Sequence, residues 1–170
     1  MRLYRGKIPM ISEEIVRTLM ADQDIETDAR EEVQLDIEAV LKEYHRQDRA
    51  VLEEAKNRME IRGLPYSQLG KTKSIVARER QLAVGDDMLP YLLDQILTML
   101  FHSANVEEVF ADDITLRKKM TKIVRRHLDV EGELDQEVRS KIKNLQEGTA
   151  TFEIEYQRVM DELKRKKRLT

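Results

Sequence analysis

The sequence predicts an all-α protein built from two similar helical units, and three observations support this prediction. Charged residues make up 37% of the chain, while Gly and Pro together number only nine, which is typical of long helices with charged surfaces. No segment shows the alternation of apolar and polar residues expected of a strand. Residues 9–35 also align without a gap on residues 90–116, at an offset of 81 positions, so we expect one unit to occur twice.

Identical and similar residues in the aligned segments predict the extent of the two units. Five positions are identical: Pro9 and Pro90, Ile15 and Ile96, Leu19 and Leu100, Glu26 and Glu107, Leu35 and Leu116. We therefore expect a first unit at residues 1–83 and a second at residues 84–170. The units could pack on each other as a helical bundle, or they could be strung apart around the loop Leu64–Ser67.

The first unit is expected to contain a short helix, a polar junction, a long helix and a closing helix. The short helix follows Pro9 and places Ile15 on its apolar face. The long helix carries an apolar seam from Ile37 to Met59, with steps of three and four residues, and Gly63 is its expected C-cap. The closing helix is predicted at residues 69–83.

The second unit is expected to repeat this series of elements. Its short helix follows Pro90, and its long helix has a seam from Met120 to Ile142 that corresponds to the first seam at an offset of 83. Gly148 is the expected end of this long helix. The closing helix is predicted at Phe152–Lys167.

The two seams skip the same position, which holds Asp48 in one and Glu131 in the other. We interpret both acids as marking a break or kink in the helix, because Gly132 follows Glu131. The alternative is a carboxylate site built around the two residues. That alternative requires Asp48 and Glu131 to be buried and close together.

Most motifs that carry chemistry are absent from the chain. It has no Cys, which excludes disulfides and thiolate metal ligands. Gly70-Lys71-Thr72 is not a phosphate-binding loop, because Pro65 stands where that loop needs Gly. None of the three histidines, His45, His102 and His127, has Glu three positions earlier, and we interpret His127 as a packed ring. We therefore expect no cofactor, no metal and no enzymatic activity.

Two basic clusters are candidate contacts for nucleic acid or for a protein partner. They comprise the mid-chain residues Lys71, Lys73, Arg78 and Arg80 and the tail residues Lys164, Arg165, Lys166, Lys167 and Arg168. The alternative for the tail is compensation of the helix macrodipole. The segment Arg2–Lys7 is a third small basic patch, which could join the other two in the folded chain.

Overall charge and hydropathy point to a cytoplasmic protein. The net charge is −3, and the halves of the chain share it evenly. The most apolar run, Met88–Phe101, contains Pro90 and Asp94 and is too short for a bilayer span, so we expect no membrane contact. The N-terminal residues form no apolar signal region, and the lack of Cys suits a reducing compartment.

Three segments carry a resemblance to a known family. They are the opening Met1-Arg2-Leu3-Tyr4-Arg5-Gly6-Lys7-Ile8-Pro9, the following Glu13-Glu14-Ile15-Val16, and the later stretch from Val33 to Tyr44. They resemble the bacterial "domain of unknown function 507" family, which covers essentially the whole length. The resemblance implies a bacterial cytoplasmic protein. The family has no assigned activity, so no catalytic residues can be carried over.

The function expected from these features is that of a non-enzymatic helical adaptor that binds other proteins. Exposure of apolar seam residues such as Val51 or Leu134 would favour this hypothesis, and their burial would weaken it. Nucleic-acid binding through the basic tail and the Lys71–Arg80 segment is the alternative. The sequence is also compatible with a homo-oligomer.

Overall fold

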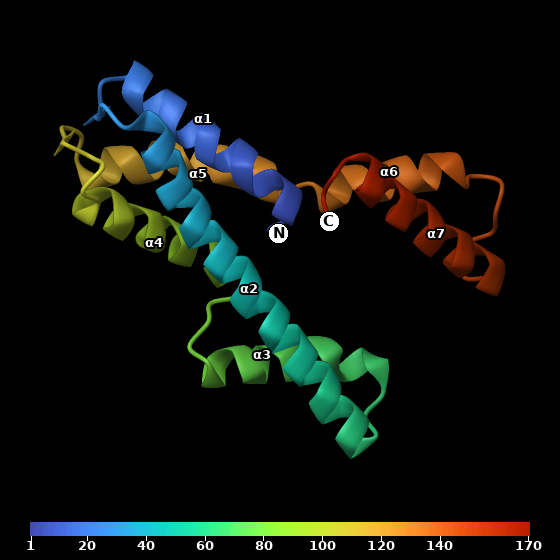
Figure 1. Cartoon of the computed structure of the whole chain (residues 1–170). Coiled ribbons are helices and arrows are strands. Elements are labelled where there is room, and N and C mark those ends of the chain that lie inside the picture. Colours follow the sequence, from blue (N-terminus) through green and yellow to red (C-terminus); the bar gives the residue numbers. More distant parts are fainter.

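The computed structural model describes all 170 residues and consists almost entirely of helices (Figure 1). The elements, in chain order, are α1 (Ile8–Ala21), β1 (Ile25–Glu26), α2 (Arg30–Arg62), α3 (Leu69–Glu79), α4 (Met88–His102), β2 (Glu108–Val109), α5 (Asp113–Leu128), α6 (Glu131–Lys141) and α7 (Ala150–Lys166). Three single 3-10 turns precede α1, α3 and α4. The all-α class predicted from the sequence is confirmed, and none of the helices is both long and apolar enough to span a membrane.

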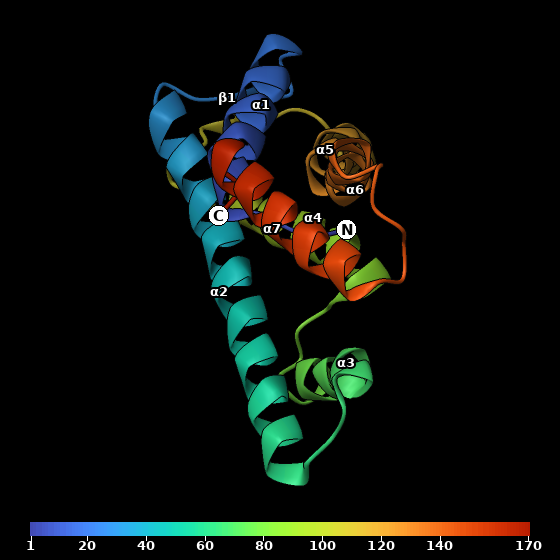
Figure 2. The ribbon, with the colours of Figure 1, turned by 90° about the vertical axis from the view of Figure 1, so that its right-hand side faces the viewer.

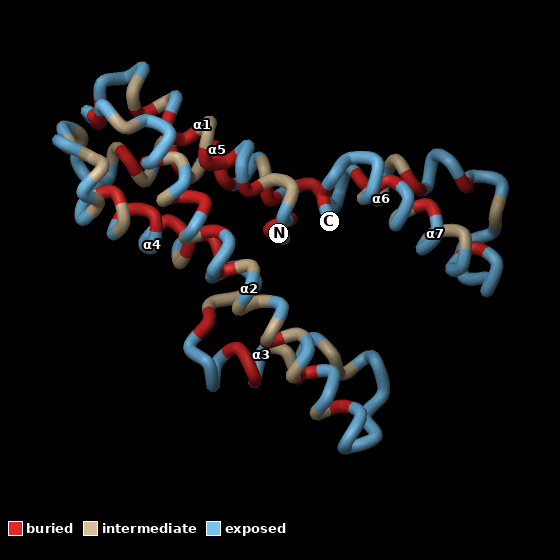
Figure 3. Tube along the Cα trace, in the orientation of Figure 1, coloured by how far each residue is buried: buried red, intermediate tan, exposed pale blue.

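The main core lies among α1, the first half of α2, α4 and α5. Each helix turns an apolar stripe inward, and the fully buried side chains include Ile15, Leu41, Ile96 and Met120. Figure 3 shows the buried residues on the inner sides of these helices. Because this core takes side chains from both halves of the chain, the halves pack on each other rather than standing apart.

The first of two arms leaves the main core where α2 continues beyond it. In this arm α3 packs across the second half of α2, and Val51, Ala55 and Val76 are buried between the two helices. The Tyr44 hydroxyl donates a hydrogen bond of 2.8 Å to the carbonyl oxygen of Ala83, which fastens the segment after α3 to α2. Figure 1 shows this arm pointing away from the other helices.

The second arm is the hairpin of α6 and α7, which has a small apolar core of its own. Leu134, Val138, Phe152 and Leu163 are among its buried residues. Figures 1 and 2 show that α6 runs nearly along the line of α5, so the second half has a broken counterpart of the long α2 helix. The break falls at Asp129 and Val130.

The two ends of the chain meet where the second arm joins the main core. Leu3 is buried in the main core, whereas the neighbouring Tyr4 is buried in the core of the second arm. The Gly6 amide donates a hydrogen bond of 3.3 Å to the carbonyl oxygen of Leu169. A Cβ atom on Gly6 would lie 1.6 Å from the carbonyl oxygen of Arg168, so only Gly allows this approach of the two backbones.

A short antiparallel ladder joins the polar junctions of the two halves. β1 pairs with β2, with Ile25 opposite Val109 and Glu26 opposite Glu108. The sequence did not predict these two-residue strands. The predicted boundary between residues 83 and 84 falls in the connection between α3 and α4, and the internal duplication itself stays a prediction.

Some of the predicted helix ends and breaks are confirmed, and others are wrong. Asp48 lies within the unbroken helix α2, so only Glu131, the first residue of α6, marks a break. Gly63 ends α2 in the left-handed conformation, with φ of 61°, as predicted. Gly148 does not end a helix in this way, because α6 ends at Lys141, before the loop that contains Gly148. The loop Leu64–Ser67 joins α2 to α3 and not one half to the other.

Candidate functional site

The four candidate cations of the mid-chain cluster differ in their surroundings. Lys71 and Arg78 are exposed on α3 and form no ion pair. Lys73 lies 2.9 Å from Asp48 on α2. Arg80 donates from Nε to Glu54 at 2.8 Å. Two of the four charges are therefore neutralised within the first arm.

The basic tail is also partly engaged within the chain. The Lys164 ammonium lies 5.7 Å from the centre of the Tyr4 ring, and Lys167 lies 2.7 Å from Glu137 on α6. Arg168 has a positive φ of 54° at the turn that brings its carbonyl oxygen to Gly6. Arg165 and Lys166 are exposed and unpaired. The tail thus has a structural role in closing the second arm.

A cavity of about 590 Å³ lies in the fork between the two arms, next to the N-terminal segment. Four of its lining residues are the cations Arg2, Arg5, Arg49 and Lys73. The N-terminal basic patch therefore joins one residue of the α3 cluster, while Lys71, Arg78 and Arg80 do not line the cavity. Apart from Lys73, these cations form no ion pair with a carboxylate of the chain.

Two side chains that line the cavity, His45 and Tyr44, have shifted pKa values. Burial, followed by the positive charges of Arg49, Arg2 and Arg5, lowers the pKa of His45, although Asp48 opposes this shift. Burial also raises the pKa of Tyr44, which lines the same cavity. Burial, supported by the arginines, thus disfavours a charged His45.

The two acids at the skipped seam positions both line this cavity, but they do not form a buried pair. Asp48 is half-buried and bound to Lys73. Glu131 is exposed and accepts a long hydrogen bond of 3.4 Å from the Tyr4 hydroxyl. The burial that a carboxylate site around Asp48 and Glu131 would require is therefore missing.

His127 is packed at the interface of α5 and α1, in agreement with its interpretation from the sequence. Its Nε2 atom lies 2.7 Å from Glu14, and its side chain is largely buried. Arg126 also pairs with Glu14. His102 instead contacts the carbonyl oxygen of Thr98 within its own helix, at 2.8 Å.

Exposed apolar side chains gather in two places that the sequence analysis missed. The seam residues Val51 and Leu134 are completely buried, so the apolar seams are used inside the molecule. At the tip of the first arm, however, Ile61 is 85% exposed and Tyr66 is 78% exposed, with Leu64 between them. A second group, Phe101, Phe110 and Ile114, is exposed at the ends of α4 and α5, beside the β-ladder. Because Ile61 departs from the seam spacing, its position could have signalled the first group.

Comparison with known protein families decides the relationship of the chain. Residues 1–169 match the family described as "Protein of unknown function (DUF507)". The chain belongs to this family. The match extends from the N-terminal segment to Leu169, so it covers both arms of this chain and the joint between the chain ends. A search of curated proteins found no match.

Proposed function

We propose that this protein is a non-enzymatic adaptor that binds other proteins, and that the tip of its first arm is a binding surface. The observation that supports the proposal is the exposure of Ile61, Leu64 and Tyr66 on a projecting helical hairpin. Exposed apolar side chains that cluster in this way mark interaction sites. Tyrosine is also enriched in protein interfaces. A cytoplasmic setting is part of the proposal, since a chain without cysteine forms no disulfides and needs no oxidising compartment.

Because these residues lie at the tip of the first arm, substitutions there can affect binding without affecting the stability of the main core. The tip loop follows the left-handed Gly63, and the turn at Tyr66 contacts α3 of the same arm, so substitutions there leave the main core intact. The tip is therefore a surface that a variant can remove without unfolding the protein.

A pull-down of tagged protein from its own host, with and without nuclease, tests the adaptor function. We expect a discrete protein partner that survives nuclease and is lost with the double variant Ile61→Ser/Tyr66→Ser. Ile154→Ser is the matched control, because Ile154 is 68% exposed on α7, far from the tip. Equal recovery of the partner with both variants would contradict the proposed binding surface.

Binding of nucleic acid is a second candidate function, which the fork favours. Arg2, Arg5 and Arg49 line its cavity without a carboxylate partner, and unpaired arginines are suited to bind phosphate groups. The free residues of the predicted clusters, Lys71, Arg78, Arg165 and Lys166, could extend this contact along the arms.

Titration of labelled single-stranded RNA and duplex DNA over a range of salt concentrations tests this second candidate. If it holds, affinity falls steeply with salt, and Arg5→Gln/Arg49→Gln reduces the slope of that dependence by about two. Lys122→Gln on α5 is the control, since Lys122 is exposed and unpaired but lies outside the fork. Binding without salt dependence would exclude this function.

A further inference from the structure

The fold gathers negative charge at one end of the molecule. The β1–β2 ladder brings together two loops, residues 22–32 and 103–113, which we call the acidic end. A hydrogen bond of 2.8 Å from the Phe110 amide to the Asp24 carbonyl oxygen extends this contact. The acidic end contains ten carboxylates and one arginine, while the rest of the chain has 23 acidic and 29 basic residues. The molecule is therefore strongly asymmetric in charge, although its two halves are not.

Most carboxylates of the acidic end have no cation within the chain. Lys119 binds Asp22 and Asp24, and Arg117 binds Asp113. The other seven are exposed and form no ion pair: Glu26, Asp28, Glu31, Glu32, Glu107, Glu108 and Asp112, of which Asp112 accepts a hydrogen bond from the Thr115 amide.

Two contacts between like charges make this arrangement unfavourable in the isolated molecule. The ladder places Glu26 directly opposite Glu108, and directly opposed like charges destabilise a strand pair. The neighbouring Asp28 raises the pKa of Glu107, because its carboxylate accepts a hydrogen bond from the protonated Glu107 carboxyl and its negative charge disfavours ionisation. A cationic surface bound here would relieve both repulsions.

Three exposed apolar side chains, Phe101, Phe110 and Ile114, lie in or next to the acidic end, and we call them the apolar patch. The ion pair between Arg117 and Asp94 marks the side of α5 and α4 on which the patch lies. Phe101 follows Asp94 by seven residues, about two turns, and Ile114 precedes Arg117 by three, so both lie on that side. Phe110 is 63% exposed and Ile114 is 77% exposed. A surface that binds here must therefore offer both apolar and basic side chains.

One face of α3 has this composition. Lys71, Ile75 and Arg78 are spaced by four and three residues, so they share one face, which we call the outer face of α3. All three are exposed, and neither cation forms an ion pair, whereas Thr72 and Val76 turn toward α2. The basic tail does not offer this combination, because its neighbour Leu169 is buried.

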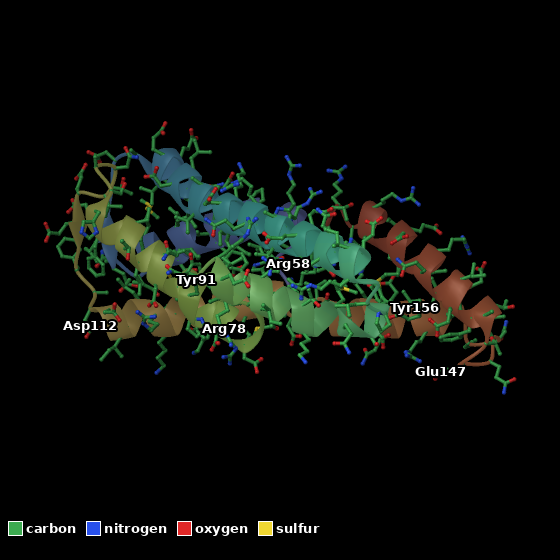
Figure 4. All side chains as sticks on the ribbon, turned by 90° about the horizontal axis from the view of Figure 1, so that it is seen from below. Arg58, Arg78, Tyr91, Asp112, Glu147 and Tyr156 are labelled. Atoms are coloured by element: carbon green, nitrogen blue, oxygen red, sulfur yellow. The ribbon has the colours of Figure 1, made fainter.

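The two complementary surfaces are too far apart to meet within one molecule. Asp36 of α2 accepts a hydrogen bond from Asn105 at the acidic end, and Arg58, 22 residues farther along α2, binds Glu79 beside Arg78. This separation corresponds to about 33 Å along a straight helix. Figure 1 shows α3 and the β-ladder at opposite ends of α2, and Figure 4 labels Arg78 and Asp112, which belong to the two regions.

We propose that the acidic end of one copy of this chain binds the outer face of α3 of a second copy, which gives a head-to-tail assembly. The contact pairs Glu26 and Glu108 with Lys71 and Arg78, and the apolar patch covers Ile75. Because the two surfaces of one molecule differ, an open assembly always has a free acidic end at one terminus and a free α3 face at the other, so it can grow further unless a ring closes. This assembly goes beyond the proposed adaptor function and needs neither a foreign partner nor the tip residues.

Sedimentation velocity of the full chain over a wide range of concentrations tests the assembly. We expect concentration-dependent association at about 20 mM salt that weakens at about 300 mM, where screening is stronger. Glu26→Lys/Glu108→Lys and Lys71→Glu/Arg78→Glu should each weaken association by roughly tenfold or more, because each places like charges opposite one another at the two proposed contact positions. Lys122→Glu, an exposed change on α5, is the control that should leave association unchanged.

Mixing the two charge-reversed variants provides the decisive readout. In the mixture the lysines at positions 26 and 108 of one variant can face the glutamates at positions 71 and 78 of the other, and the native pairs can also form, so we expect association to recover toward the wild-type level. Phe110→Ser should weaken association without any change of charge. A wild-type chain that stays monomeric at every concentration overturns the proposal. So does a mixture that remains as dissociated as its two components, because that result places the contact elsewhere.

Discussion

Gly6 lies where the two ends of the chain approach each other most closely. Its neighbours Leu3 and Tyr4 enter different apolar cores, and its amide binds the carbonyl oxygen of Leu169. The opening motif that resembles the family is thus explained by packing. One short segment holds the second arm against the main core.

The substitution Gly6→Ala should loosen this joint. The new Cβ atom would clash with the backbone at Arg168, and such a clash costs about 1–3 kcal/mol of stability in a packed site. Chemical denaturation and limited proteolysis after Leu163 would show the effect. Gly70→Ala is the control, because a Cβ atom there has open space and alanine favours a helix. Equal stability of Gly6→Ala and wild type would show that the chain ends do not hold the arm.

The partly buried contact between Glu14 and His127 gives stability a dependence on pH. Burial opposes ionisation of Glu14, but the hydrogen bond from His127 and the charge of Arg126 together hold its pKa below the ordinary value of 4.5. A carboxyl whose pKa is lower in the folded state stabilises the fold above its unfolded-state pKa, and this stability is lost as the pH falls through the folded-state pKa.

The variant Glu14→Gln measures that contribution. At pH 7 we expect it to lower the free energy of unfolding by about 1–2 kcal/mol, because a charge-assisted hydrogen bond is lost. The difference from wild type should shrink as the pH falls below 4.5, where the native carboxyl becomes protonated. Urea denaturation at several pH values checks this expectation. A difference that does not change with pH would mean that the charge of Glu14 is unimportant.

At the scale of the elements, the second arm differs from the rest of the molecule in how much apolar surface supports it. It depends on nine buried residues of its own, whereas the main core and the first arm share one cluster of 28. Because local unfolding requires less free energy where fewer apolar contacts are broken, α6 and α7 should open independently of α1 and α4.

Hydrogen exchange of Leu134→Ala tests this independence. Leu134 is completely buried, and truncation of a buried leucine costs about 2–5 kcal/mol. We expect faster amide exchange in α6 and α7, with protection in α1 and α4 unchanged. Leu116→Ala, at a buried position of the main core, should instead accelerate exchange in α1, α2, α4 and α5. Faster exchange throughout the chain in both variants would indicate a single cooperative unit.

At the scale of the whole molecule, the main core needs both halves of the chain. α1 and α2 come from residues 1–83, and α4 and α5 come from residues 84–170, yet their apolar faces form one cluster. Neither half can bury the apolar faces of its helices alone. Without that burial, no hydrophobic free energy offsets the conformational entropy that the chain loses on folding.

Separate fragments 1–83 and 84–170 should therefore fail to fold as units. We expect each fragment to melt without a cooperative transition in circular dichroism, while an equimolar mixture regains helical signal and a sigmoidal melt. A cooperative transition of either fragment alone would contradict the shared core. It would favour two independent units of the kind that the duplication predicts.

Local patterns were enough to predict the helices and the junctions between them. The seam from Ile37 to Met59 specified α2, because helical spacing of apolar residues is a property of neighbours in the sequence. Gly63 was a correct C-cap for the same reason. Asp48 was misread as a break because its contact with Lys73, 25 residues away, lets an acid occupy a seam position.

The surfaces of the molecule depend on contacts between distant segments. Composition showed a charge shared evenly by the two halves, but the β1–β2 ladder joins residues about 80 positions apart and brings ten carboxylates to one end. Packing likewise buried Val51 and Leu134, left Ile61 and Tyr66 exposed, and brought Arg2 and Arg5 to Arg49. Helix formation is encoded locally, so the sequence revealed the elements. The charged and apolar surfaces arise from long-range packing, so they became visible only in the folded chain.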